Sequence, residues 1–105
     1  MSTYELDYHP TAEDDLFAIF NMIENYAGTI IAERKLAEME RVTRGLTTYP
    51  YIGSTRDDLR AGLRAIPVAD KGVISFVIDE SKHTVRILCI SYAGADWMAR
   101  IRDRT

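Results

Sequence analysis

The sequence VISFVI at Val73–Ile78 is followed, after the polar connection Asp79–His83, by VRILCI at Val85–Ile90. Both segments are rich in Val, Ile and Phe, which favour β-strands, and the connection has a length that hairpins commonly use. We therefore predict that the two segments pair as antiparallel strands. Upstream of them, Leu63–Val68 is predicted to be another strand, with a free side because Pro67 lacks one ladder donor.

The N-terminal part of the chain is predicted to form one strand and a first helix. Tyr4–Tyr8 alternates apolar and polar residues, which is the pattern of a half-buried strand. A helix is predicted over Ala12–Tyr26, with Thr11 as its N-cap and Gly28 at the position of a C-terminal cap. Asp14, three residues after Thr11, would complete a short-armed version of the capping box. Its apolar stripe has helical spacing and consists of Leu16, Ile19, Phe20 and Ile23.

A second helix is predicted to follow at once, with Thr29 as its N-cap and an end before Tyr49 and Pro50. Its stripe recurs at spacings of three and four residues and consists of Ala32, Leu36, Met39, Thr43 and Leu46. Two amphipathic helices joined by a few residues form a hairpin. Neither apolar stripe can remain in water, so the hairpin must pack on the sheet.

The predicted fold class is α+β, in the order β-α-α-β-β-β. A helix hairpin packs on a small, mainly antiparallel sheet, and a short C-terminal helix follows over Trp97–Arg102. Asp96 is the predicted cap of this helix, and its arginines are expected to face water. The 105 residues and 11.9 kDa allow a single domain over residues 1–105.

The cysteine and histidine content argues against metal and redox chemistry. Cys89 is the only cysteine and sits in an apolar segment, so we interpret it as a packed thiol. His9 and His83 have no carboxylate or cysteine ligand set nearby in the sequence, and we expect no metal and no cofactor. No apolar run approaches the roughly 18 residues of a membrane span, so we expect no membrane contact and a cytoplasmic location.

Charge is distributed unevenly along the chain. The net charge of −3 argues against a broad grip on phosphates, and no direct sequence-specific binding of nucleic acid is expected. Residues 1–33 hold seven acids and no Lys or Arg, whereas residues 34–105 hold all 13 bases and carry +4. Either the acidic part is a solvated helix face, or the basic part meets a polyanion or an acidic peptide.

Arginines are the remaining candidates for chemistry, because nucleophile-elbow, phosphate-loop and zinc-protease motifs do not occur in the sequence. Arg56, Arg60 and Arg64, together with Arg86 on a later strand, have two interpretations. They converge near one sheet edge, where guanidinium groups suit carboxylate or phosphate partners. Alternatively, they are solvated and paired with neighbouring aspartates.

Two stretches carry a resemblance to a known family. GSTRDDLRAGLR at Gly53–Arg64, followed by the paired strands and by Ala93–Asp96, resembles the ParE branch of the ParE/RelE bacterial toxin superfamily. PTAEDDL at Pro10–Leu16 is similar to the start of the first helix in that family. The match covers nearly the whole chain. It implies the toxin of a type II toxin–antitoxin system, held inactive by a ParD-like antitoxin.

The resemblance leaves a choice between two toxin activities. RelE-like members are ribosome-dependent messenger RNA endoribonucleases that use lysines and arginines, whereas ParE-like members inhibit DNA gyrase. At the positions of the basic and tyrosine groups of the ribonucleases, this chain has Ala65, Pro67, Ile74, Ala95 and Trp97. We therefore predict a non-catalytic gyrase inhibitor. After the last strand, where the ParE branch often has His and Arg, this chain has Tyr92 and Ala95.

Candidate site residues follow from these interpretations. The antitoxin is predicted to contact the helix hairpin and the arginine series, at Leu16, Phe20, Arg56, Arg60 and Arg64. The candidate target-binding residues are Arg86, Tyr92, Trp97, Arg100 and Arg102, and Arg104 belongs to the same basic terminus. Two alternatives stay open: a ribonuclease that uses Arg64, Arg86 and Tyr92 in a rearranged site, and a non-toxic relic that keeps only antitoxin binding.

Overall fold

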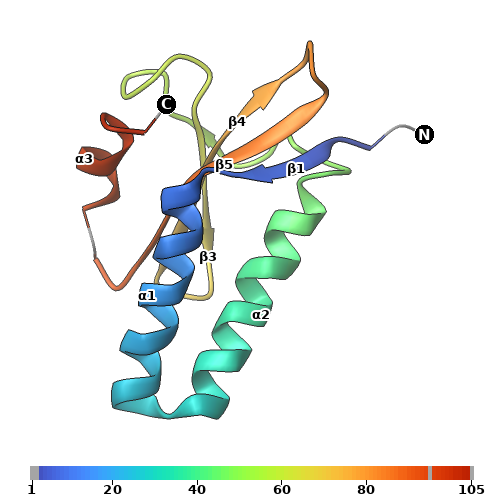
Figure 1. Ribbon diagram of the computed structural model, residues 1–105. Helices are drawn as coiled ribbons and strands as arrows, with labels where there is room; N and C mark the ends of the chain where they lie inside the picture. Colours follow the sequence, from blue (N-terminus) through green and yellow to red (C-terminus); the bar gives the residue numbers. More distant parts are fainter. Residues whose placement is uncertain (1–2, 95, 105) are drawn as a thin grey trace.

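The structure, a computed structural model, describes residues 3–94 and 96–104 of one α+β unit (Figure 1). Its elements are, in order, β1 (Glu5–Tyr8), α1 (Pro10–Ala27), α2 (Thr29–Gly45), β2 (Ser54–Thr55), β3 (Arg64–Val68), β4 (Gly72–Asp79), β5 (Thr84–Tyr92) and α3 (Trp97–Ile101). The predicted order of helices and longer strands is confirmed. The short strand β2 is an addition, because two polar residues carry no strand pattern.

The five strands form one sheet in the order β1-β5-β4-β3-β2. β4 and β5 pair as the predicted antiparallel hairpin, from Asp79 opposite Thr84 to Gly72 opposite Tyr92. β1 lies parallel to β5, with Leu6 opposite Val85. A parallel pair needs a crossover connection, and the hairpin of α1 and α2 supplies it.

Two apolar clusters hold the layers together, one on each face of the sheet. The helix hairpin covers one face, and α3 lies on the other (Figure 1). Ile23 of α1 and Met39 of α2 pack with Phe76 and Ile87 in the first cluster. The β4–β5 ladder contains a bulge at Leu88, which has no partner residue on β4. The bulge places both Leu88 and Cys89 in the second cluster. The other members of that cluster's buried centre are Leu63 and Ile101.

Helix α1 begins two residues earlier than the sequence predicted, and Thr11 is not its cap. His9 is the N-cap, and its Nδ1 accepts a hydrogen bond from the Thr11 backbone N–H at 3.2 Å. Pro10 occupies the first helical position, where its fixed φ suits a helix and its missing N–H has no consequence. The predicted contribution of Asp14 to a capping box is therefore wrong.

Gly28 links the two long helices and lies at the C-terminal end of α1, as the sequence predicted. Its φ of 93° lies in the region that favours glycine, and it serves both as the C-cap of α1 and as the N-cap of α2. The predicted capping by Thr29 is wrong, because its hydroxyl donates instead to Glu24 Oε2 at 2.8 Å. At α3 the predicted cap is confirmed, since the Asp96 carboxylate accepts from the Ala99 N–H.

The short strand β2 pairs with the beginning of β3, with Ser54 opposite Ala65. Gly53 precedes it with a φ of 80°, and a Cβ there would lie 2.5 Å from the Ala65 carbonyl oxygen, so the close approach of these strands requires glycine. Pro67 lies beyond the reach of β2, on the free side of β3 that the sequence predicted.

Candidate functional site

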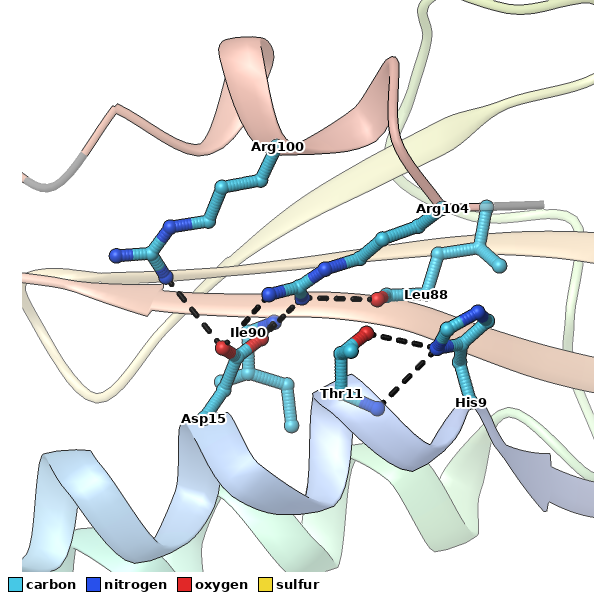
Figure 2. A network of polar contacts seen from close by, with 7 residues as sticks. All are labelled: His9, Thr11, Asp15, Leu88, Ile90, Arg100 and Arg104. Atoms are coloured by element: carbon cyan, nitrogen blue, oxygen red, sulfur yellow. Dashed lines mark hydrogen bonds and ion pairs between the residues drawn. The ribbon is translucent and has the colours of Figure 1, made fainter.

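A buried carboxylate connects α1, β5 and the C-terminal segment (Figure 2). Asp15 has a side chain that is only 8% exposed. Its Oδ2 accepts from the Ile90 N–H at 2.9 Å, and its two oxygens form a bidentate pair with the Arg104 guanidinium. Arg100 adds a longer contact at 3.5 Å from Nη1 to Oδ1. We call Asp15, Arg100 and Arg104 the carboxylate clamp.

The carboxylate clamp completes a sheet edge that β1 leaves open. The last bond between the segment of β1 and β5 runs from the His9 N–H to the Ile87 carbonyl. Beyond it, Arg104 Nη1 donates to the Leu88 carbonyl at 3.1 Å, and Asp15 accepts from the N–H of Ile90. Unpaired backbone groups at such an edge are costly when buried, so these side chains take the place of a longer β1.

The expectation that the arginines of the C-terminal helix face water is wrong for Arg100, and Arg104, just beyond the helix, is buried further. The Arg104 side chain is only 12% exposed, and the hydrogen bonds that it donates to Asp15 raise its pKa above the ordinary value. Arg100 is half-buried against Asp15, whereas Arg102 is exposed. The sequence held a signal for this: Asp15 falls on the apolar stripe of α1, three residues after Ala12, where a carboxylate needs a buried partner.

The carboxylate clamp fixes α3 over the second apolar cluster. Ile101 is buried, and Trp97 packs on the cluster that contains Cys89. Burial raises the pKa of the Cys89 thiol to about 11, so the group stays neutral near pH 7. A neutral, buried thiol is a poor nucleophile. The geometry thus agrees with a packing role for Cys89.

The arginine series does not form one cluster. Arg56 pairs with Asp58 at 3.0 Å and lies 5.4 Å from the ring centre of Trp97. Arg60 donates to the Arg104 carbonyl at 2.9 Å, so Arg56 and Arg60 both support the C-terminal segment. Arg64 lies elsewhere, with its guanidinium 5.3 Å from the ring centre of Tyr51.

The three residues of the alternative ribonuclease site are separated in space. Arg64 lies opposite Phe76, and Arg86 lies opposite Val77, the next residue of β4. Because successive residues of a strand point to opposite faces, the two guanidinium groups belong to different faces of the sheet. Arg86 forms an ion pair with Asp7 on β1. Tyr92 is buried at the far end of the β4–β5 ladder, opposite Gly72.

The positions that carry basic groups in the resembling ribonucleases are apolar in this chain. Ala65 and Ile74 are buried in the sheet, and Pro67 is exposed on β3. Trp97 contacts the second apolar cluster, as above, and Ala95 lies outside the described residues. None of the four described side chains can donate a charge to a phosphate.

The outer side of the helix hairpin carries a groove in two parts. Phe20 and Leu36 line a hollow of about 440 Å³ between α1 and α2, together with charged residues of α2 such as Arg41. Leu16 lines a neighbouring hollow of about 380 Å³ with Tyr8 of β1. We call these two hollows the hairpin groove. Leu16 and Phe20, both predicted to bind antitoxin, thus lie on one continuous side of the molecule.

Metal and membrane sites can be considered for the residues that the structure describes. In residues 3–94 and 96–104, no three His, Cys, Asp or Glu side chains are arranged to hold a metal ion. Over the same ranges, no helix has the length and apolar character needed to cross a membrane.

The family model described as the ParE toxin of the type II toxin–antitoxin system, parDE, matches residues 6–97. The chain belongs to this family. No curated protein sequence matches it. A chain of the chromosomal ParDE toxin–antitoxin system from P. aeruginosa is similar in structure, with a TM-score of 0.74 and 18% identity, over 87% of this chain and 97% of that one. This similarity shows a shared fold.

Two RelE-type structures share the fold of this ParE-family chain. A doubly substituted mutant of E. coli toxin RelE in the free state has a TM-score of 0.64 and 14% identity, over 92% of this chain and 90% of that one. A chain of the RelBE2 toxin–antitoxin complex from Mycobacterium tuberculosis has a TM-score of 0.59 and 20% identity, over 89% and 94%. The fold alone therefore does not separate the two toxin activities.

Proposed function

We propose that this ParE-family toxin inhibits DNA gyrase by binding it, without turnover of its own, and that a cognate ParD-like antitoxin keeps it inactive in the cytoplasm. The observation that carries the non-catalytic part is the separation of Arg64, Arg86 and Tyr92. Cleavage of RNA at a ribose 2′-hydroxyl needs a base and cationic donors around one phosphate. In this chain the possible donors lie on different faces of the sheet.

Charge pairing supports the same conclusion. Arg86 is bound to Asp7, Arg104 to Asp15 and Arg56 to Asp58. An arginine held by a carboxylate brings little net charge to a phosphate, and the chain as a whole carries −3. A toxin that works on RNA in the ribosome would gain from the opposite balance.

Expression of the chain alone in bacteria tests the proposed target. We expect DNA damage signalling to rise soon after induction, while protein synthesis continues at first. Purified chain is expected to inhibit supercoiling by purified gyrase. Immediate arrest of translation, with supercoiling intact, would reject the proposal.

The second candidate function is a RelE-like ribonuclease, and the structural similarity to RelE is the observation that favours it. It predicts cleavage of ribosome-bound message that is lost in Arg86→Ala and in Tyr92→Phe. The third candidate, a non-toxic relic, predicts that overexpression of the folded chain is harmless. Following growth, message integrity and supercoiling in one experiment separates the three candidates.

The hairpin groove is the surface that we propose for the antitoxin. An amphipathic helix can lay its apolar face into such a groove, and Phe20, Leu36 and Leu16 provide the apolar contacts. Of the predicted arginines, Arg56 and Arg60 already contact the C-terminal segment of this chain. We therefore expect charge reversal at Arg60 to act on antitoxin affinity by loosening that segment.

A further inference from the structure

A group of aromatic side chains surrounds one carboxylate near the end of α2. The Tyr4 hydroxyl donates to Glu80 Oε1 at 2.8 Å, and the Tyr51 hydroxyl donates to Glu80 Oε2. The His83 ring stacks on Tyr4 with centroids 3.9 Å apart. Beside them lies a hollow of about 320 Å³, which we call the tyrosine cradle, lined by Tyr4, Thr48, Tyr49, Pro50, Tyr51 and Ile52.

The tyrosine cradle has a lining of its own and lies far along α2 from the loop that joins the long helices (Figure 1). Tyr4 donates its backbone N–H to the Thr47 carbonyl, two residues beyond the end of α2 at Gly45. The helix loop at Gly28 is at the opposite end of α2 (Figure 1). None of the residues lining the cradle lines the hairpin groove. A partner confined to the hairpin groove thus contacts no residue that lines the cradle.

The rings of the tyrosine cradle are held in place before any partner arrives. One carboxylate receives the hydroxyls of both Tyr4 and Tyr51, so each ring has a fixed position and direction. The same bonds raise the pKa of Tyr4 to about 12 and lower that of Glu80, which keeps donor and acceptor in their paired forms near pH 7. Side chains ordered in advance lose little entropy on binding.

The tyrosine cradle exposes apolar surface next to a cation. Tyr49 and Tyr51 are 68% and 54% exposed, and Ile52 is also exposed. The Arg64 guanidinium lies 5.3 Å from the Tyr51 ring centre and donates to the Ile52 carbonyl at 3.2 Å. Within the described part of the chain, Arg64 forms no ion pair with an acid. Tyrosines beside arginine are the composition of energetic centres in protein interfaces.

We propose that the tyrosine cradle grips the target protein through an extended segment that carries an aliphatic residue or proline beside an aspartate or glutamate. The apolar side chain enters the hollow between Tyr49 and Tyr51, and the carboxylate pairs with Arg64. Arg64 donates to the Ile52 carbonyl, so the carboxylate meets the guanidinium on the Ile52 side of the cradle. A nucleic acid fits less well, because the negative charge of Glu80 faces its row of phosphates.

The choice of gyrase as the target in the test rests on the proposed function. We compare Tyr49→Ala, Tyr51→Phe and Arg64→Glu with two controls from the helix hairpin, Tyr26→Ala and Arg34→Glu. Tyr26 is 63% exposed, so the tyrosine control matches Tyr49 in exposure and in the size of the change. Tyr51→Phe keeps the ring and loses only its bond to Glu80. Thermal unfolding followed by circular dichroism checks that each variant is folded.

Three readouts are measured for each variant: growth arrest, the concentration that half-inhibits supercoiling, and affinity for the antitoxin. We expect Tyr49→Ala and Arg64→Glu to weaken the first two by about tenfold or more, and Tyr51→Phe to weaken them less. Antitoxin affinity stays the same in Tyr49→Ala and Tyr51→Phe, whose residues line only the cradle. Arg64 is also a predicted antitoxin contact, so Arg64→Glu is compared by the first two readouts alone. If the wild-type chain inhibits gyrase and the cradle variants inhibit it equally well, the cradle proposal is overturned and the proposed function stands.

The remaining outcomes separate the two proposals. If the wild-type chain arrests growth and leaves gyrase active, the proposed function fails, and loss of growth arrest in Tyr49→Ala still supports the cradle as the target surface. Binding of a single-stranded oligonucleotide that disappears in Tyr49→Ala and Arg64→Glu would make the cradle a nucleic-acid site and overturn the proposal. A wild-type chain that neither arrests growth nor inhibits gyrase overturns both proposals.

Discussion

Replacement of Asp15 by alanine is expected to cause a large loss of stability. The Arg104 side chain is only 12% exposed, and the substitution removes the carboxylate that pairs with it. The substitution also leaves the Ile90 N–H without an acceptor. Removing one partner of a buried ion pair costs about 3–5 kcal/mol. The higher helix propensity of alanine offsets at most about 0.7 kcal/mol of that loss.

This loss is large for a single domain of this size, whose total stability is about 5–15 kcal/mol. At about 4–8 °C per kcal/mol, Asp15→Ala lowers Tm by at least about 10 °C. Asp14→Ala is the matched control, because Asp14 is the adjacent acid and is exposed. Its cost is expected to stay below about 1 kcal/mol.

Urea unfolding measures the coupling between Asp15 and Arg104. The variants compared are Asp15→Ala, the control Asp14→Ala, Arg104→Met, and the double variant that combines Asp15→Ala with Arg104→Met. We expect the loss in the double variant to be smaller than the sum of the single losses by about 1–3 kcal/mol, because no unpaired cation remains. If Asp15→Ala unfolds within 1 kcal/mol of Asp14→Ala, or if the two losses are additive, the carboxylate clamp has no special energetic role and our reasoning is refuted.

Three further predictions concern the other surfaces. Glu80→Gln is expected to move the pKa of Tyr4 from about 12 towards its ordinary value of 10, as measured by tyrosinate absorbance. In the wild-type chain the bond between Tyr4 and Glu80 stabilises the fold below pH 10, and this stabilisation is lost as the pH rises through 12. An unchanged titration would contradict the assignment. Cys89 is expected to react with a thiol reagent only when α3 detaches, so Asp15→Ala should speed labelling, whereas fast labelling of the wild-type chain would argue against a fixed α3. Phe20→Glu is expected to lower antitoxin affinity by about tenfold or more through loss of the hairpin groove, whereas Phe17→Glu, on an exposed phenylalanine three residues away, should leave it unchanged.

The sequence predicted those parts of the fold that depend on local patterns. The strands β4 and β5 follow from runs of β-branched residues joined by a polar connection, and the helix hairpin follows from stripes such as Leu16 and Phe20. The parallel placement of β1 beside β5 was not predicted. It depends on where the helix hairpin returns the chain, which no local pattern encodes.

The surfaces were harder to predict, because they depend on contacts between distant residues. Asp15 and Arg104 are 89 positions apart, and the run of acids at the start of α1 looks like ordinary dipole stabilisation. Tyr4, Tyr51 and Glu80 come from three separate segments. Of the two interpretations of the arginines, convergence at one sheet edge fails at Arg86, because the strand period places it on the face opposite to Arg64.

A titration of purified gyrase with this chain distinguishes inhibition by binding from catalysis. The supercoiling rate is measured against chain concentration, and an in vitro translation reaction receives the same amounts of chain. We predict that inhibition saturates at a fixed ratio of chain to gyrase, while the translated message stays intact. Full supercoiling at every ratio, together with message that is cut repeatedly by substoichiometric chain, would contradict the proposed function.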